Sequence, residues 1–114
     1  MNPDCIFCKI ASGAIPARRL YETDTILAFP DAGPQAPTHI LVIPKQHIAS
    51  LADATTNHTE LLGQLLAAAA EVARQQHLDR GYRVVINTGA DGGQTVPHLH
   101  LHILGGRHMT WPPG

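Results

Sequence analysis

An alternation of imidazole and apolar side chains near the C-terminus constrains this chain more than any other feature. Positions 98–104 read His-Leu-His-Leu-His-Ile-Leu. Successive side chains of a strand point to opposite faces, so the alternation predicts a strand over residues 97–104 with His98, His100 and His102 on one face. Adjacent imidazoles discourage one another from carrying charge. We therefore expect the row to have a chemical task.

Three chemistries suit such a row of histidines. Neutral imidazole is a metal ligand, imidazolium can donate to a phosphate, and one ring nitrogen can attack as a nucleophile while a hydrogen bond holds the other. A glycine-rich loop over residues 89–95 leads into the strand. Its backbone amides could hold an anion, although a plain hairpin connection is the alternative. Because the carboxylates are scattered, a two-metal phosphatase has little support, and the pattern favours a histidine nucleophile.

Composition limits the classes of partner. The chain has 114 residues, Lys+Arg 8 against Asp+Glu 9 and a net charge of -1. This length predicts a single domain over residues 1–114 with a hydrophobic core of its own. No basic patch stands out, so nucleic acid is an unexpected partner. The sequence shows neither a secretory leader nor a membrane-spanning run, and we expect a cytoplasmic protein with reduced thiols.

Cys5 and Cys8 form the one Cys-x-x-Cys pair. The pair could be redox-active, although the βαβ context of a thioredoxin-like motif is missing. It could instead be two buried structural thiols, or half of a zinc site that needs two further ligands. From the pair alone these three interpretations stay open.

The hydrophobic pattern predicts a mixture of strands and helices. A short helical turn should follow Cys5 and end at Gly13. Thr55, Thr56 and Asn57 are candidate caps for a long helix that runs to about residue 78, with Glu60 in capping-box register with Asn57. The broad apolar arc of that helix indicates contact with the sheet on one side and a second subunit on the other. Strands are predicted over residues 19–22, 25–29, 39–44, 82–87 and 97–104, with a short element at 48–51.

Several segments together make the chain resemble a known family. Residues 98–104 fit the His-x-His-x-His motif of the histidine triad superfamily, with two apolar residues after it. Segments from the whole chain resemble the Hint branch of that superfamily, namely 29–31 (Phe-Pro-Asp), 34–39 (Pro-Gln-Ala-Pro-Thr-His), 42–45 (Val-Ile-Pro-Lys), 81–83 (Gly-Tyr-Arg), 91–94 (Asp-Gly-Gly-Gln) and 111–114 (Trp-Pro-Pro-Gly).

The resemblance implies an α+β fold. A five-stranded antiparallel sheet would carry one long and one short helix, and two copies would form a homodimer with a ten-stranded sheet. It also implies hydrolysis of purine nucleoside 5′-phosphoramidates, such as adenosine 5′-monophosphoramidate or adenylated lysine. The products would be AMP and an amine, released through a nucleotidyl-histidine intermediate that needs no metal.

The resemblance also implies roles for single residues. His100 would be the nucleophile, His102 and His39 would stabilise phosphate charge, and Thr95 would lie near the leaving amine. The family's usual residue at position 95 is serine, and threonine adds a methyl group there. Substrate-binding positions would be Asp31 at the ribose, Asn87, Gly93, Gln94 and Thr95 at the phosphate, Ile6, Phe7, Ile10, Phe29 and Ile40 around the base, and Trp111 in a tail that reaches toward the partner subunit.

A zinc site is implied by the resemblance to bacterial members of the branch and to galactose-1-phosphate uridylyltransferases. Their pattern gives Cys5, Cys8, His47 and His98 as the ligands here. An imidazole bound to zinc cannot attack phosphorus, which agrees with His98 being the end of the row that catalysis can spare. We expect a structural zinc that fastens the N-terminal segment to the histidines.

Two other functions remain as alternatives. One is hydrolysis of dinucleoside polyphosphates, as in the Fhit branch, which carries a glutamine where this chain has Leu104-Gly105-Gly106. The other is a zinc-stabilised module that binds a nucleotide or a partner without significant turnover.

Overall fold

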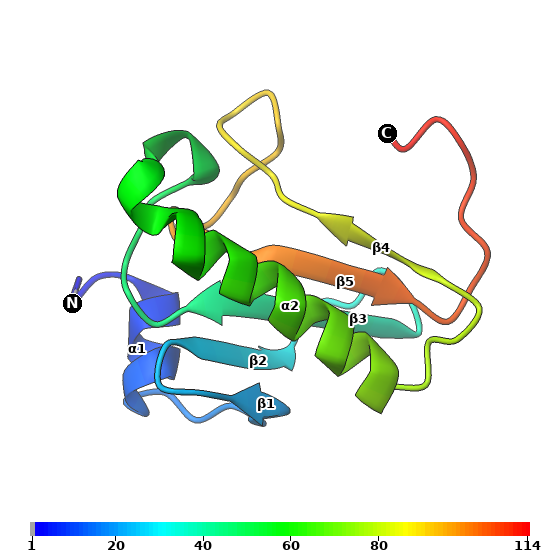
Figure 1. Ribbon diagram of the computed structural model, residues 1–114, viewed down its shortest axis with the longest axis horizontal. Helices are drawn as coiled ribbons and strands as arrows, with labels where there is room; N and C mark the ends of the chain where they lie inside the picture. The colour runs from blue at the N-terminus through cyan, green and yellow to red at the C-terminus, as the bar shows by residue number, and fades with distance from the viewer. Residues whose placement is uncertain (1) are drawn as a thin grey trace.

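A single antiparallel sheet forms the centre of the molecule in the computed structural model, which describes residues 2–114 (Figure 1). Its strand order is β1-β2-β3-β5-β4, and every neighbouring pair is antiparallel. The strands are β1 (Tyr21–Glu22), β2 (Ile26–Pro30), β3 (Thr38–Pro44), β4 (Tyr82–Val85) and β5 (Leu101–Gly105). The predicted α+β class, with five antiparallel strands and two helices, is confirmed.

The two faces of the sheet carry different cores. In the register of β3 with β5, Ile40 lies opposite Ile103 and Leu41 lies opposite His102. Ile40 and Ile103 belong to the core beneath the long helix, whereas Leu41 packs with the N-terminal helix on the other face. His39 is adjacent to Ile40 in β3, and His102 is adjacent to Ile103 in β5. Both histidines therefore point to the opposite face, which is the face of the N-terminal helix.

The long helix α2 (Thr59–Gln75) crosses one face of the sheet (Figure 1). It buries Leu65, Ala68, Ala69, Val72 and Ala73 against the strands. The predicted capping box of Asn57 with Glu60 is wrong, although Thr55, another of the predicted caps, does form one, and the helix ends at Gln75 rather than near residue 78. Two short 3-10 turns, η1 (Leu51–Asp53) and η2 (Thr56–His58), precede the helix, and the capping box pairs Thr55 with His58. Nδ1 of His58 accepts a hydrogen bond from the Thr55 N–H, and α2 begins at the next residue, Thr59.

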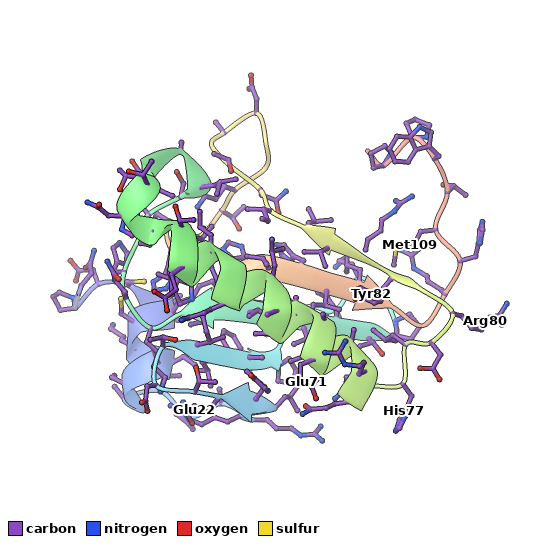
Figure 2. All side chains as sticks on the ribbon, in the orientation of Figure 1. Glu22, Glu71, His77, Arg80, Tyr82 and Met109 are labelled. Atoms are coloured by element: carbon purple, nitrogen blue, oxygen red, sulfur yellow. The ribbon has the colours of Figure 1, made fainter. Side chains whose placement is uncertain are left out.

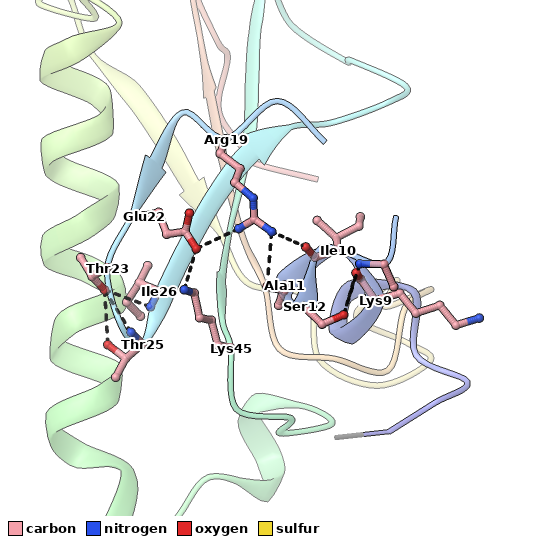
Figure 3. Close-up of polar contacts among 11 residues, drawn as sticks. Lys9, Ile10, Ala11, Ser12, Arg19, Glu22, Thr23, Thr25, Ile26 and Lys45 are labelled. Carbon is pink, nitrogen blue, oxygen red and sulfur yellow. Dashed lines mark hydrogen bonds and ion pairs between the residues drawn. The ribbon is translucent and has the colours of Figure 1, made fainter. Parts of the chain in front are cut away.

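The short helix α1 (Ile6–Ser12) begins at Cys5 and ends at Gly13, as predicted. Gly13 has φ 87°, a left-handed conformation that glycine adopts without strain. Arg19 closes this end, because its Nη2 donates to the carbonyls of Ile10 (2.8 Å) and Ala11 (3.3 Å) (Figure 3). Glu22 then bridges Arg19 (2.9 Å) and Lys45 (2.6 Å), which ties α1 to the sheet (Figure 3).

The histidine segment differs from its prediction in one respect. Strand β5 begins only at Leu101, so His98 and His100 lie in irregular chain before it. Because the Leu99 N–H donates to the Ile48 carbonyl (2.7 Å), it is not available to a neighbouring strand. The alternation of sides persists nevertheless, since Leu99 is buried in the same core as Leu101.

The remaining strands differ from expectation only at their ends, and β4 stops at Val85, two residues early. No helix in the described part of the chain is long and apolar enough to cross a membrane.

Candidate active site and metal centre

Two thiols and two imidazoles meet where α1 approaches the segment before β5. The ligand atoms of Cys5, Cys8, His47 and His98 lie within 4.8 Å of one another. The Nδ1 atoms of His47 and His98 are 3.2 Å apart, and the sulfur-to-nitrogen distances are 3.2, 3.4 and 3.6 Å. Tetrahedral zinc with ordinary bond lengths requires about 3.3 Å between two nitrogens and about 3.5 Å between sulfur and nitrogen. The cluster therefore fits zinc in both donor type and size.

The surroundings of this cluster prepare the donors. Nε2 of His98 donates to the Pro44 carbonyl (2.8 Å), so the lone pair of the neutral ring is on Nδ1 and faces the sulfurs. Burial lowers the pKa of His98, which keeps the ring in its neutral, ligating form. Burial also raises the pKa of the Cys5 thiol. A bound cation would supply the charge that a thiolate needs there.

The main chain of His98 holds the ring of His100. Nδ1 of His100 donates to the His98 carbonyl at 2.7 Å. Because the proton of the neutral ring is on Nδ1, the lone pair is on Nε2. The ring of Phe7 packs edge-on against both imidazoles, at 5.8 Å from His98 and 5.2 Å from His100. His100 is thus a fixed and largely buried imidazole whose Nε2 can attack.

A chain of hydrogen bonds fixes the other two histidines. The Gln35 N–H donates to Nδ1 of His39 (3.0 Å), which places the proton of a neutral His39 ring on Nε2. That Nε2 then donates to Nδ1 of His102 (2.9 Å). Asp31 lies 3.5 Å from the same His39 nitrogen. The order leaves the His102 proton on Nε2, and the His102 ring lies 5.0 Å from that of His100.

His102 is neutral at pH 7. Its pKa is lowered to about 4, first by burial and then by the neighbouring rings of His100 and His39. The neutral ring can donate one hydrogen bond without placing a positive charge beside His100.

Asp31, His39 and His102 also bring three possible metal-ligand atoms together. The Gln35 N–H occupies the lone pair of His39 Nδ1, so a neutral His39 has a proton rather than a lone pair on Nε2. A metal at this position would have to displace that proton. Of the two donor clusters in residues 2–114, the Cys5 cluster is the one that fits a metal.

The loop before the histidines is held by its own side chains. Nδ2 of Asn87 donates to the Gly92 carbonyl (2.7 Å). Gln94 uses its whole amide internally: Nε2 donates to the carbonyls of Ala49 (2.8 Å) and Val96 (3.0 Å), and Oε1 accepts the Gly89 N–H (3.1 Å). Gly93 has φ 78° and is exposed, and Thr95 is exposed beside it.

The apolar residues predicted around a base divide into two groups, and Trp111, predicted in a tail that reaches toward the partner subunit, lies apart from both. Phe7, Ile10 and Phe29 are buried together on the face of the histidines, and Ile6 beside them is 48% exposed. Ile40 lies in the core under α2, on the opposite face, so the sheet separates it from His100. Trp111 is 82% exposed in the C-terminal tail.

Two further groups shape the site and were not predicted. The Gln35 N–H sets the tautomer of His39, and the Pro44 carbonyl sets that of His98. Both act through the main chain, which every residue type carries, so no side-chain pattern could have identified them.

Comparison with known proteins identifies the family to which the chain belongs. The chain matches the family model described as "Scavenger mRNA decapping enzyme C-term binding" over residues 4–111. It is 59% identical, over the full length of both chains, to a protein of Synechococcus elongatus described as an uncharacterized HIT-like protein. The chain belongs to the histidine triad (HIT) superfamily.

Other HIT relatives add detail about the group. A maize protein named "14 kDa zinc-binding protein" is 54% identical over 111 residues, which are 96% of this chain and 87% of the maize protein. The crystal structure of a HIT family hydrolase from Legionella pneumophila superposes with a TM-score of 0.95 at 54% identity, covering 97% of this chain and all of the other. This HIT chain therefore has close relatives described as a hydrolase and as a zinc-binding protein.

Proposed function

We propose that this HIT protein hydrolyses the P–N bond of purine nucleoside 5′-phosphoramidates. The observation that supports this most is the hydrogen bond from His100 Nδ1 to the His98 carbonyl, which leaves Nε2 as the attacking atom. The family membership and the hydrolase described in Legionella support the reaction class. The choice of phosphoramidate over other phosphate compounds comes from the resemblance to the Hint branch.

The proposed reaction has two displacements at the α-phosphorus. Nε2 of His100 attacks, the P–N bond breaks, and the amine takes up a proton from solvent as it leaves on the side proposed for Thr95. The nucleotide is then bonded to Nε2 of His100, whose Nδ1 proton still donates to the His98 carbonyl. Water attacks the same phosphorus and releases a proton to solvent, AMP leaves and Nε2 regains its lone pair. One water is consumed for each amine and AMP released.

The other residues are proposed to bind the substrate. Neutral His102 and its partner His39 would donate to the phosphoryl oxygens, together with the exposed backbone at Gly93. Asn87 would act through the amide oxygen that its contact with Gly92 does not use, and Asp31 would accept from the ribose hydroxyls. Phe7, Ile10, Phe29 and Ile6 would pack against the base. Gln94 would keep the phosphate loop in shape from within.

We propose that Cys5, Cys8, His47 and His98 hold a structural zinc ion. Their distances fit a tetrahedral site, and the maize relative is named for zinc binding. When bound, zinc would supply cross-linking of α1 to the segment that carries His100, and no acid–base chemistry. Elemental analysis of the purified protein should give about one zinc per chain, and Cys8→Ser should lose it. A wild-type protein without zinc and with unchanged stability after chelation would contradict this assignment.

We also propose a homodimer. Strand β4 has an unpaired edge, since it ends the strand order. Beside that edge Tyr82 and Val84 are 42% and 37% exposed, and Leu66 on α2 is 55% exposed. Antiparallel pairing of two β4 edges would join the sheets into ten strands and cover these apolar side chains.

Replacement of the nucleophile tests the proposed reaction. Wild-type protein should release AMP from adenosine 5′-phosphoramidate, and His100→Asn should lower kcat by at least about 1,000-fold, because no covalent intermediate can form. The matched control is His58→Asn, in the capping box before α2, with turnover unchanged. Acid-sensitive radiolabel on wild type, absent from His100→Asn, would identify the intermediate. Equal turnover by both proteins would exclude His100 as the nucleophile.

One observation supports the second candidate, a dinucleoside polyphosphate hydrolase. The matching family model is described by a decapping enzyme, and an mRNA cap contains a dinucleoside polyphosphate. The two candidates differ in the value of kcat/KM for a phosphoramidate and for a dinucleoside polyphosphate measured side by side. Tight AMP binding with turnover of neither substrate would instead indicate a binding module.

A further inference from the structure

A second pocket lies at the far end of α2, on the other face of the sheet from His39 and His102. It is a cavity of about 390 Å³ between the segment that follows α2 and the turn that follows β5. Leu78 lines it and lies against Gly105. Figure 2 labels His77 and Arg80 at this end of the molecule. The volume falls in the range of about 300–1,000 Å³ that small-molecule sites occupy.

The lining of this pocket is basic. Arg80, Arg107, His77 and His108 all contribute, and among residues 2–114 no aspartate or glutamate lines the pocket. The ion pairs of this part of the chain include neither arginine. Arg107 donates only to the carbonyls of Gln35 and His108, both at 3.3 Å. Two arginines therefore line one cavity that, within residues 2–114, no carboxylate lines, although the chain as a whole has a net charge of -1.

The backbone around the pocket is unusual at His77. This residue has φ 59°, and it is the one non-glycine residue of the described chain with a positive φ. It follows α2 at a helix end where the Leu78 N–H returns to the Ala73 carbonyl, a position that glycine occupies without strain. The chain instead has an imidazole there that lines the pocket. A costly conformation that presents a functional group at a cavity is typical of a binding site.

The opening of the pocket gives a ligand access to the backbone. Gly81 has φ 116°, and a Cβ built on it would meet nothing within 4 Å. Gly106, which also lines the pocket, has φ 89°, where a side chain would be strained and its Cβ would approach Pro37 to 2.9 Å. Both glycines thus leave the main chain without a side chain, and each is adjacent in sequence to one of the two arginines.

We propose that this pocket binds the phosphate group of a small molecule. Two guanidinium groups can each form paired hydrogen bonds with phosphate oxygens, and such charge-assisted bonds are stronger than neutral ones. The imidazoles of His77 and His108 add donors at the rim. The cavity is too small and too local for a nucleic-acid strand, so a free phosphate, a diphosphate or a phosphorylated metabolite is the expected class. This site is independent of the proposed phosphoramidase reaction.

Amide NMR of the full-length protein can test the proposal site by site. Titration with inorganic phosphate, pyrophosphate and AMP in low salt should shift the Gly81 and Gly106 amide signals, with a pyrophosphate Kd of about 1 mM or tighter. The double variant Arg80→Gln/Arg107→Gln should raise that Kd at least tenfold. The exposed Arg18→Gln serves as the control and should leave it unchanged. Tighter binding of AMP than of phosphate would identify a phosphorylated metabolite, and equal binding would identify phosphate itself as the ligand.

His77→Gly separates binding from strain. Glycine relieves the positive φ, so this variant should have a Tm a few degrees above wild type while its pyrophosphate Kd rises. The proposal is overturned if neither glycine signal moves with any of the three anions. It is equally overturned if the double arginine variant binds pyrophosphate as well as wild type does.

Discussion

At the scale of single residues, the histidines are distinguished by what holds each ring. His98 donates to a carbonyl and turns a nitrogen toward two thiols, His100 donates to a carbonyl and keeps Nε2 open, and His102 accepts from His39. Identical side chains thus differ in which ring nitrogen is free, which suits the roles proposed for them as ligand, nucleophile and donor. The difference arises from one hydrogen bond per ring, which selects the tautomer.

His102 should make stability depend on pH. Its folded pKa of about 4 lies below the value near 6.5 of an unfolded chain. Between these values the unfolded state binds a proton that the folded state does not, so stability falls as the pH decreases from about 7 to about 4 and levels off below that. His102→Asn should flatten this slope. Chemical denaturation of both proteins at each pH tests this, since the zinc ligands are the same in both, and parallel curves would disprove it.

The face of the sheet on which a strand residue lies can be predicted from the sequence. His39, the second residue of β3, and His102 lie within hydrogen-bond distance, and the alternation of sides that puts them on one face is visible in the sequence. The same alternation argues against Ile40 as a residue of the base pocket. It follows His39 directly in the strand, so period two alone places it on the opposite face and away from a base pocket.

At the scale of elements, α1 is fastened at both ends. Cys5 and Cys8 hold its N-terminal end against His98, and Arg19 caps its C-terminal carbonyls (Figure 3). A helix of seven residues is too short to be stable alone in water. Its position therefore depends on these two attachments and on the burial of Phe7, Cys8 and Ile10.

Arg19→Gln should loosen the C-terminal attachment. The variant loses hydrogen bonds to Ile10, Ala11 and Glu22, and we expect it to cost about 1 kcal/mol of unfolding free energy, since the group is partly exposed. Arg18→Gln removes the neighbouring exposed arginine and should change little. Urea denaturation of the three proteins gives the comparison. Equal midpoints for Arg19→Gln and wild type would show that the cap carries no stability.

Elements were predictable where side-chain pattern decides them and not where a main-chain bond does. Periodicity predicted the sheet and both helices, because alternating or helical burial is written in the side chains. The start of β5 at Leu101 depends on the bond from the Leu99 N–H to Ile48, and the start of α2 depends on the ring of His58. Such bonds join segments whose proximity only the fold creates.

At the scale of the whole molecule, the unpaired edge of β4 is where we propose that a second copy of the chain pairs. Wild-type protein should sediment at about twice the chain mass of 12.2 kDa. Val84→Glu places a charge in the proposed interface. It should raise the Kd for dimer dissociation at least tenfold, so that more of the protein is monomeric. Leu51→Glu changes a similarly exposed apolar residue away from β4 and should remain dimeric. A monomeric wild type at micromolar concentration would contradict the homodimer.

His98 contacts the proposed zinc site and the proposed nucleophile through different atoms. Its imidazole faces the thiols, whereas its carbonyl oxygen accepts a hydrogen bond from His100 Nδ1. Every amino acid retains that oxygen, so mutagenesis here can delete the ligand and never the acceptor. Variants of His98 therefore remove the proposed zinc ligand and keep the carbonyl. Their activity would show whether the main-chain hydrogen bond alone orients the His100 ring when zinc is lost.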